Sequence, residues 1–352
     1  MKEQNDLTLV SRYRGPLMGF AALWIYFFHE WQPLFSEVNG LSTVEAFIKR
    51  IGFCGVDIFL FLSGIGLCFA IGKSSIGHFY YRRIRRLIIP FLGIALVRAS
   101  LEKWNTATFF GNVTGYNFYT KSIYSFLWYV PAILTLYLIF PLFYKIFDKV
   151  KSKLLLTVGL LELWLLLSLI FEKKMRADLY GFTNRLPIFL VGILIGFLMK
   201  NKSVIFKWKW LFFVMTAVLG FYLAWKTNQD NMRVLVPTSN CCVPNFLMSI
   251  SLCFLLAGGL DFLMNHAKPL GKGISAFFSF FGKISLEFYC MQEWFTKLLK
   301  PIFPKDLALI WKNLAVFAIV TAAAFLLHLY SELIWKAIEL LCKPKKKTSK
   351  AV

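Results

Sequence analysis

The sequence is poor in charge, and above all in negative charge. Only 16% of its 352 residues are charged, whereas a typical soluble domain has about 25%. Acidic residues number 18 against 40 basic ones, while 58% of all residues are hydrophobic. This balance excludes a soluble domain with an ordinary polar surface and predicts an all-α, polytopic membrane protein.

Side chains that hold metals or form disulfides are also scarce. The chain has four histidines and seven cysteines, and they do not show the spacing of a metal site. Most of the cysteines lie inside apolar runs, where Cys behaves as a small hydrophobic residue. We therefore expect neither a metal site nor a disulfide framework.

A contiguous basic domain is missing as well, although the net charge is +22. The lysines and arginines lie in short clusters between apolar runs, whereas a nucleic-acid-binding protein concentrates them on one domain or face. We therefore exclude nucleic acid as a partner and expect the basic clusters to face membrane lipids.

Long apolar runs dominate the chain, and ten of them approach the roughly 20 residues that a membrane-spanning helix needs. They are residues 15–34, 51–72, 87–101, 123–146, 153–171, 186–200, 210–226, 244–264, 274–297 and 309–334. Basic residues concentrate in alternate links, and positive charge favours the cytoplasmic side. We predict about ten transmembrane helices with both termini cytoplasmic, one transmembrane domain over residues 1–341, and a basic tail over residues 342–352. The first run continues too far to be a secretory signal.

The link after the second run holds four arginines within five positions. Arg82, Arg83, Arg85 and Arg86 fall in a predicted loop of about a dozen residues at the cytoplasmic side. Guanidinium groups match phosphate with paired hydrogen bonds, so this loop is a candidate anion site. The alternative is that the arginines only mark the cytoplasmic side of the membrane.

Ionisable residues inside apolar runs are costly in a bilayer and indicate function. His29 ends the first run, Glu30 follows it, and Asp57 begins the second run on the same predicted side. A neutral imidazole can take a proton from a hydroxyl, and a carboxylate can orient it. The alternatives are an interfacial histidine and an acid at a helix start. The other residues of this kind are Glu162, Glu287, Glu293, His328 and Glu332.

Six segments of the chain form a recognisable set in their order and spacing. They are GFAALWIYFFH ending at His29, GVDIFLFLSGIGL from Gly55, FYYRRIRRLIIPF from Phe79, FLWYVPAILTLYLIFPLF from Phe126, RLPIFLVGILIG from Arg185, and GKISLEFYCMQEW from Gly282. Together they resemble the acyltransferase-3 family of bacterial integral membrane acyltransferases along almost the whole chain.

The resemblance implies an activity and a division of roles. An acyl group, commonly acetyl, would move from cytoplasmic acyl-CoA to a hydroxyl of an envelope carbohydrate, such as a lipid-linked glycan, at the plasma (inner) membrane. Acyl-CoA would be a consumed donor, with no permanently bound cofactor. His29 would be the catalytic base, and an RxxR element would hold the CoA phosphates. Both Arg82 with Arg85 and Arg83 with Arg86 fit that element.

Two places depart from the pattern of the family. An acid and an arginine are common early in its first helix, where this chain has Gly15 and Met18, so that Arg12 or Arg14 would have to substitute. A histidine is common after SLxxYLxx, where this chain has Gln292, whose amide can hydrogen bond but cannot exchange protons.

Two other functions remain open from the sequence. One is a transporter that moves an acyl donor or a small solute, using the same buried charges as a pathway. The other is a non-catalytic membrane scaffold in polysaccharide assembly. The sequence has no internal repeat, which counts against a transporter built from inverted repeats.

Overall fold

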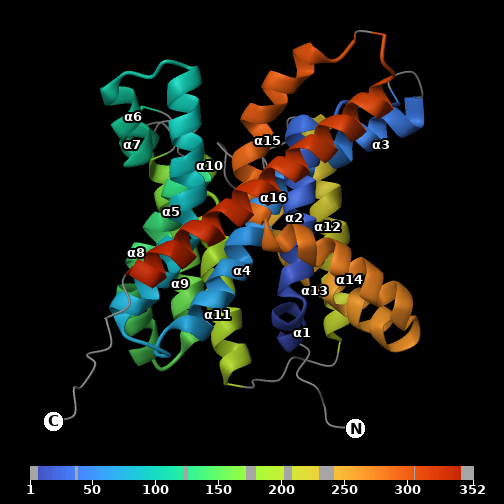
Figure 1. Ribbon diagram of the computed structural model, residues 1–352. Coiled ribbons are helices and arrows are strands. Elements are labelled where there is room, and N and C mark those ends of the chain that lie inside the picture. The colour runs from blue at the N-terminus through green and yellow to red at the C-terminus, as the bar shows by residue number, and fades with distance from the viewer. Residues whose placement is uncertain are drawn as a thin grey trace, which may run out of the picture.

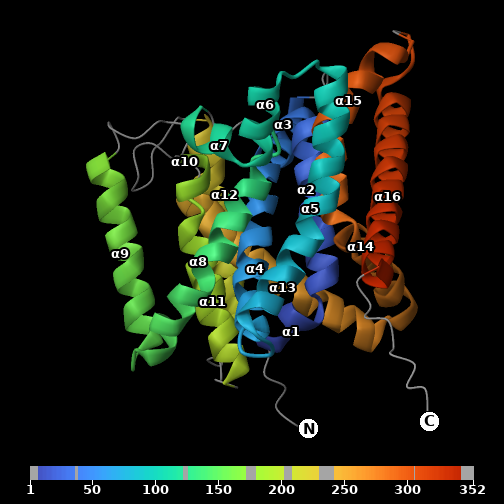
Figure 2. The ribbon, with the colours of Figure 1, turned by 60° about the vertical axis from the view of Figure 1, so that its left-hand side comes forward.

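The computed structural model describes residues 7–35, 39–121, 126–171, 180–201, 208–229, 242–304 and 306–341. Regular structure within these ranges is entirely helical. Figures 1 and 2 show the long helices gathered side by side, with the beginning of α1 and the end of α16 toward the same end of the bundle. The predicted basic tail, residues 342–352, lies outside the described residues.

The α-helices and two 3₁₀ turns follow one another along the chain without strands in the described part. They are α1 (Leu7–Arg12), α2 (Arg14–Glu30), α3 (Asn39–Arg50), η1 (Ile51–Cys54), α4 (Gly55–Ala70), α5 (Ile76–Leu101), α6 (Thr106–Val113), α7 (Tyr116–Thr120), α8 (Tyr129–Lys149), α9 (Lys153–Phe171), α10 (Tyr180–Thr183), α11 (Leu186–Lys200), α12 (Lys209–Gln229), α13 (Cys242–His266), α14 (Lys268–Lys283), α15 (Ser285–Leu299), η3 (Lys300–Ile302) and α16 (Leu309–Leu341).

Seven helical segments in the described part are long and apolar enough to cross a membrane. They cover residues 40–70, 129–149, 153–170, 181–200, 209–227, 242–266 and 309–341. The all-α, multi-pass prediction is therefore confirmed. The count of ten spans and the cytoplasmic termini stay predictions, because α2 and α15 have 17 and 15 residues and α5 carries the arginine cluster.

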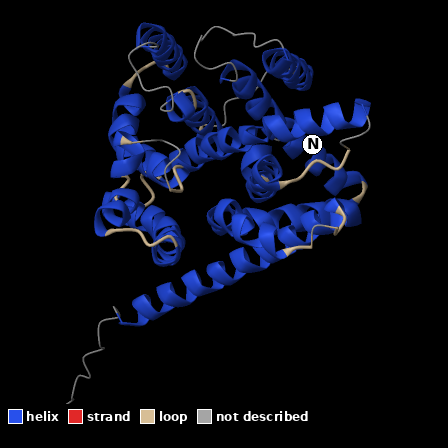
Figure 3. Cartoon of the chain, turned by 90° about the horizontal axis from the view of Figure 1, so that it is seen from above, coloured by secondary structure: helices blue, strands red, loops and turns tan. Residues whose placement is uncertain are grey.

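Helix α4 lies at the centre of the bundle. Thirteen of its 16 residues are buried, so that protein rather than lipid surrounds it, and its neighbours include α2 and α11. Seen from above in Figure 3, α16 runs obliquely along one side of the bundle, whereas several other helices are viewed nearly end-on. Helix α4 is therefore enclosed by other helices, and α16 passes along one side of the bundle.

The predicted single span over residues 274–297 is wrong, because the chain turns there. Helix α14 ends at Lys283 and α15 begins at Ser285, and Figure 1 shows α14 lying across the lower part of the bundle while α15 rises from it. A Cβ on Gly19 would lie 1.8 Å from the carbonyl oxygen of Phe278. This close crossing of α14 over α2 fixes where α15 starts.

The predicted loop around the arginine cluster is also wrong. These arginines lie in the first half of α5, which begins at Ile76 behind an N-cap, Ser75, whose hydroxyl accepts a hydrogen bond from the backbone N–H of His78 at 3.3 Å. Arginine is a good helix former, and residues three or four apart share a helix face. Arg83 and Arg86, three residues apart, therefore share one face of α5.

Candidate functional site

A cavity of about 690 Å³ opens at the centre of the bundle. Its walls come from α2, α4, α5, α8, α15 and α16 and from the end of α14. The volume falls in the range of small-molecule sites, about 300–1,000 Å³. Four arginines and two lysines line it, against a single acidic residue, Glu332. An anion is therefore the kind of group that its lining attracts.

Helix α2 lines the cavity along one face. Its lining residues are Arg14, Met18, Ala22 and Ile25, and the steps of three and four residues place them on a single stripe. His29 is the next position of that stripe, one turn beyond Ile25. Its side chain is exposed at the end of α2, and the lining of the cavity on this helix ends at Ile25, one turn before it.

Asp57 faces away from the cavity. The lining residues of α4 are Val56, Phe59 and Ser63, whereas the Asp57 carboxylate is buried with its Oδ2 3.4 Å from Nε of Arg185, an ion pair without hydrogen-bond geometry. No hydrogen bond or ion pair joins Asp57 to His29 within the described ranges. The structure thus gives Asp57 a neighbour at the N-cap of α11 in place of the predicted histidine.

Glu30 also lies apart from the main cavity. It is 7% exposed and lines a second, much smaller cavity of about 20 Å³ together with Lys312 and Asn313 at the start of α16. Because His29 continues the cavity stripe of α2 and Glu30 follows it by 100° around the helix, the two side chains face different surroundings.

The segment after His29 is held by two side chains that the sequence did not single out. The Asn313 amide accepts from the backbone N–H of Gln32 at 3.1 Å and donates to its carbonyl oxygen at 2.8 Å. The Glu45 carboxylate accepts from the backbone N–H groups of Leu34 and Phe35 at 2.8 and 3.0 Å. Both clamps act within a few residues of the predicted base.

The four predicted arginines have four different surroundings. Arg83 lies over the rings of Phe79 and Tyr137, at 5.3 and 5.7 Å. Arg82 donates to the Ser74 hydroxyl at 3.0 Å. Arg85 is outside the cavity lining, pairs with Glu339 and lies over the Trp335 ring.

Two of the guanidinium groups in the cavity keep unused donors. The Nε atoms of Arg14 and Arg83 are buried without a hydrogen-bond partner in the part of the chain that the structure describes. Buried polar groups normally find a partner, so these two arginines are the natural place for a bound anion. Arg12, the other candidate from the first helix, instead forms an ion pair with Asp261 at 2.9 Å.

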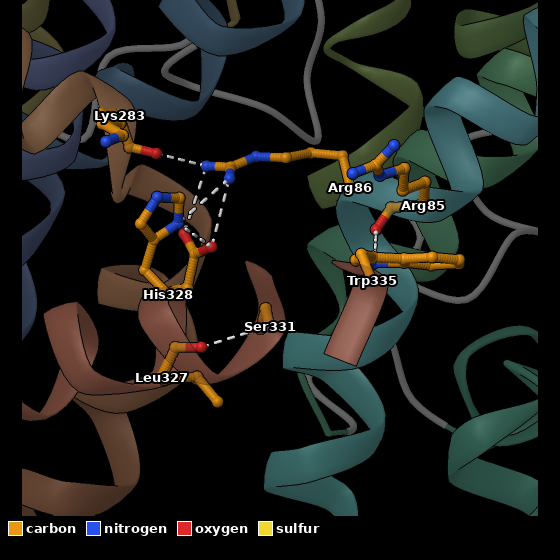
Figure 4. Close-up of polar contacts among 8 residues, drawn as sticks. Arg85, Arg86, Lys283, Leu327, His328, Ser331 and Trp335 are labelled. Carbon is orange, nitrogen blue, oxygen red and sulfur yellow. Dashed lines mark hydrogen bonds and ion pairs between the residues drawn. The ribbon is translucent and has the colours of Figure 1, made fainter. Parts of the chain in front are cut away.

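Arg86, which is partly exposed, reaches two buried residues, Glu287 and His328. Its Nη1 and Nη2 each lie 3.2 Å from one oxygen of the Glu287 carboxylate, and Nη2 also donates to the Lys283 carbonyl oxygen. Nδ1 of His328 lies 2.9 Å from Glu287 Oε1. Figure 4 shows Arg86 reaching toward His328 and Lys283, while Arg85 lies beside Trp335.

Of the three residues that depart from the family pattern, Met18 and Gln292 line the cavity and Gly15 does not. Gln292 is 1% exposed, and its Oε1 has no hydrogen-bond partner among the described residues. Tyr289 and Ser63 add hydroxyl groups to the same lining. Tyr289 and Gln292 belong to the SLEFYCMQ segment, which indicated a site in the sequence without showing which of its side chains face the cavity.

The comparisons with known proteins agree with this geometry. A family model described as an acyltransferase domain, that of acyltransferase family 3, matches residues 17–329. Searches of curated proteins and of solved structures return no significant match. The matched region includes every helix that lines the cavity, although Arg14 and part of α16 extend beyond it. The chain therefore belongs to the acyltransferase-3 family and is a membrane acyltransferase.

Proposed function

We propose that this protein is an O-acyltransferase of the bacterial plasma membrane. It takes an acyl group, acetyl in the first instance, from cytoplasmic acyl-CoA and transfers it to a hydroxyl of an envelope carbohydrate or lipid-linked glycan. One observation carries the proposal: a single stripe of α2 runs from Arg14 in the basic part of the cavity to His29 at the surface.

The donor phosphates bind at Arg14 and Arg83, with Arg82 beside them. The unused Nε donors of the first two side chains support this assignment, as does the single acid in the cavity lining. Of the two RxxR pairs, Arg83 with Arg86 is favoured, because both line the cavity and Arg85 does not. Arg86 contributes less charge, since Glu287 already pairs with it.

The length of α2 between Arg14 and His29 suits an acyl-CoA arm. Arg14 and His29 are 15 residues apart on α2, a rise of about 22 Å at 1.5 Å per residue. An extended chain advances about 1.2 Å per bond, so the roughly 13 bonds from phosphorus to sulfur span about 15 Å. An arginine side chain reaches a further 6–7 Å or so. The thioester can thus come close to His29 while the phosphates stay at the arginines.

His29 acts as the general base of the transfer. Its ring takes the proton of the acceptor hydroxyl, and the oxygen attacks the thioester carbonyl carbon. The tetrahedral intermediate collapses by breaking the C–S bond, and the proton passes to the departing CoA thiolate. Asp57 and Glu30 face away from the cavity, so we assign them to fixing the helix ends around His29.

The test is transfer of radiolabelled acetyl from acetyl-CoA to envelope glycans in membranes. We expect label with the wild type, at least a hundredfold less with His29→Ala, and at least tenfold less with Arg83→Ala. Arg85→Ala is the matched control and should retain transfer. Full transfer by His29→Ala would overturn the mechanism. Uptake of donor by vesicles without labelled product would favour the transporter.

A further inference from the structure

His328 is a cavity residue that the proposed mechanism does not use. It lies on α16, is 4% exposed and lines the cavity beside Arg86. In Figure 4 its ring lies next to the end of the Arg86 side chain, and the same guanidinium group also reaches the backbone carbonyl of Lys283. An imidazole held this far inside the bundle needs partners for both of its nitrogens.

One ring nitrogen has its partner. Glu287, which is 0% exposed, accepts from Nδ1 of His328 at 2.9 Å, and the same carboxylate pairs with Arg86 through both oxygens. We assign the hydrogen to Nδ1, because a carboxylate accepts hydrogen bonds, whereas Arg86 Nη1 lies 3.5 Å from the same nitrogen, at the limit of hydrogen-bond distance. Nε2 is then the ring nitrogen that can accept a hydrogen bond.

The second ring nitrogen, Nε2, faces the cavity. Within the described ranges no hydrogen bond reaches Nε2 of His328, and the ring lines the cavity. The site therefore presents a fixed hydrogen-bond acceptor to whatever occupies the cavity near Arg86. Its natural ligand is a hydroxyl or an amide N–H of the donor.

The position of His328 favours the hydroxyl of the donor arm over its amide N–H groups. Arg86 is three residues from Arg83 on α5, a rise of about 4.5 Å. In the arm of CoA, the carbon that bears the pantoate hydroxyl is about four bonds from the phosphorus, or about 5 Å. The first amide nitrogen is about two bonds further and the second about four beyond that, which brings them toward Gln292.

We propose that Nε2 of His328 accepts the hydrogen bond of the pantoate hydroxyl, with Glu287 fixing the ring. This inference rests on the proposed function and makes His328 a specificity residue for donors that carry a pantetheine arm. Glu287 is a positioning residue, because it acts through the histidine.

Competition binding can distinguish a contact to the pantoate hydroxyl from a general effect on donor binding. Purified full-length protein in detergent is saturated with radiolabelled acetyl-CoA, which is displaced by CoA, by pantetheine or by N-acetylcysteamine. Pantetheine keeps the hydroxyl but lacks the nucleotide, and N-acetylcysteamine lacks both. The variants are His328→Ala, His328→Gln, Arg83→Ala and, as a control outside the cavity, His266→Ala at the exposed end of α13.

For His328→Ala we expect about a tenfold weaker inhibition constant for CoA and for pantetheine, and an unchanged constant for N-acetylcysteamine. Arg83→Ala should weaken CoA alone, and His266→Ala should resemble the wild type. Binding of N-acetylcysteamine at wild-type strength also shows that a variant is folded. If His328→Ala does not fold, His328→Gln should show the same split with a smaller shift.

If His328→Ala weakens the binding of all three thiols equally, or weakens the binding of none of them, the inference is overturned while the proposed function stands. A loss of acetyl transfer without any change in binding would instead make His328 a base and would also overturn it. If the wild type binds no acetyl-CoA at all, the proposed function and this inference both fail.

Discussion

Arg83 and Arg85 are two positions apart on α5 and face opposite surroundings. Arg83 lines the cavity, where its Nε lacks a partner, whereas Arg85 pairs with Glu339 and its backbone oxygen accepts from the Trp335 indole at 2.9 Å. Two residues turn a helix by about 200°, which separates the two guanidinium groups into different roles.

The first prediction concerns this pair. Arg83→Ala should raise the KM for acetyl-CoA about tenfold or more, because a charge-assisted contact to phosphate is lost. Arg85→Ala should change KM less than about threefold and stability by at most about 1 kcal/mol, since it removes a partly exposed ion pair. Initial rates over a range of acetyl-CoA concentrations decide the matter. A larger effect for Arg85→Ala would contradict the assignment.

The second prediction concerns the pair of Arg86 and Glu287. Glu287→Leu should destabilise the protein by about 1–3 kcal/mol, because it leaves Arg86 without its carboxylate. Replacing both residues, as in Arg86→Met with Glu287→Leu, should cost less than the sum of the single changes. Unfolding of the purified protein in detergent, measured for the wild type, both single variants and the double variant, gives the coupling. Simple additivity would mean that the two groups do not stabilise each other.

Hydropathy could predict the multi-pass, all-α fold, because seven helical segments in the described part are long and apolar enough to cross a membrane. The break at Ile284 could not be predicted, since no proline marks it, a single lysine beside it does not by itself end a helix, and the cause is the crossing of α14 over α2 at Gly19. The helical arginine cluster was missed for a related reason. Four charges within five positions resembled a loop, although arginine favours helices and Ser75 supplies an N-cap.

The candidate site was only partly visible in the sequence. The stripe from Met18 through Ile25 to His29 follows helical spacing and could have been read directly. The partners of Asp57 and Arg85 could not, because Arg185 and Glu339 lie 128 and 254 residues away along the chain. Long-range contacts of this kind depend on how the helices pack, which spacing within one helix does not reveal.

The third prediction concerns the clamp beyond His29. Asn313→Leu removes both hydrogen bonds to the backbone of Gln32, and a small displacement of a catalytic group is enough to slow a reaction strongly. We expect kcat to fall about tenfold with little change in the KM for acetyl-CoA, because the phosphate site is remote. Asn265→Leu, at an exposed asparagine of α13, is the control. A change in KM alone would indicate that the clamp acts on donor binding.

The last prediction concerns Gln292, whose buried Oε1 has no partner in the described part of the chain. An unsatisfied buried polar group costs about 1–3 kcal/mol, so Gln292→Leu should leave the free energy of unfolding unchanged or raise it. Acetyl transfer should nevertheless fall about tenfold, because the amide is retained to hydrogen bond the donor arm. Thermal unfolding and transfer rates measured on one preparation test both halves. If stability and activity fall together, Gln292 is part of the packing, and the donor arm does not depend on it.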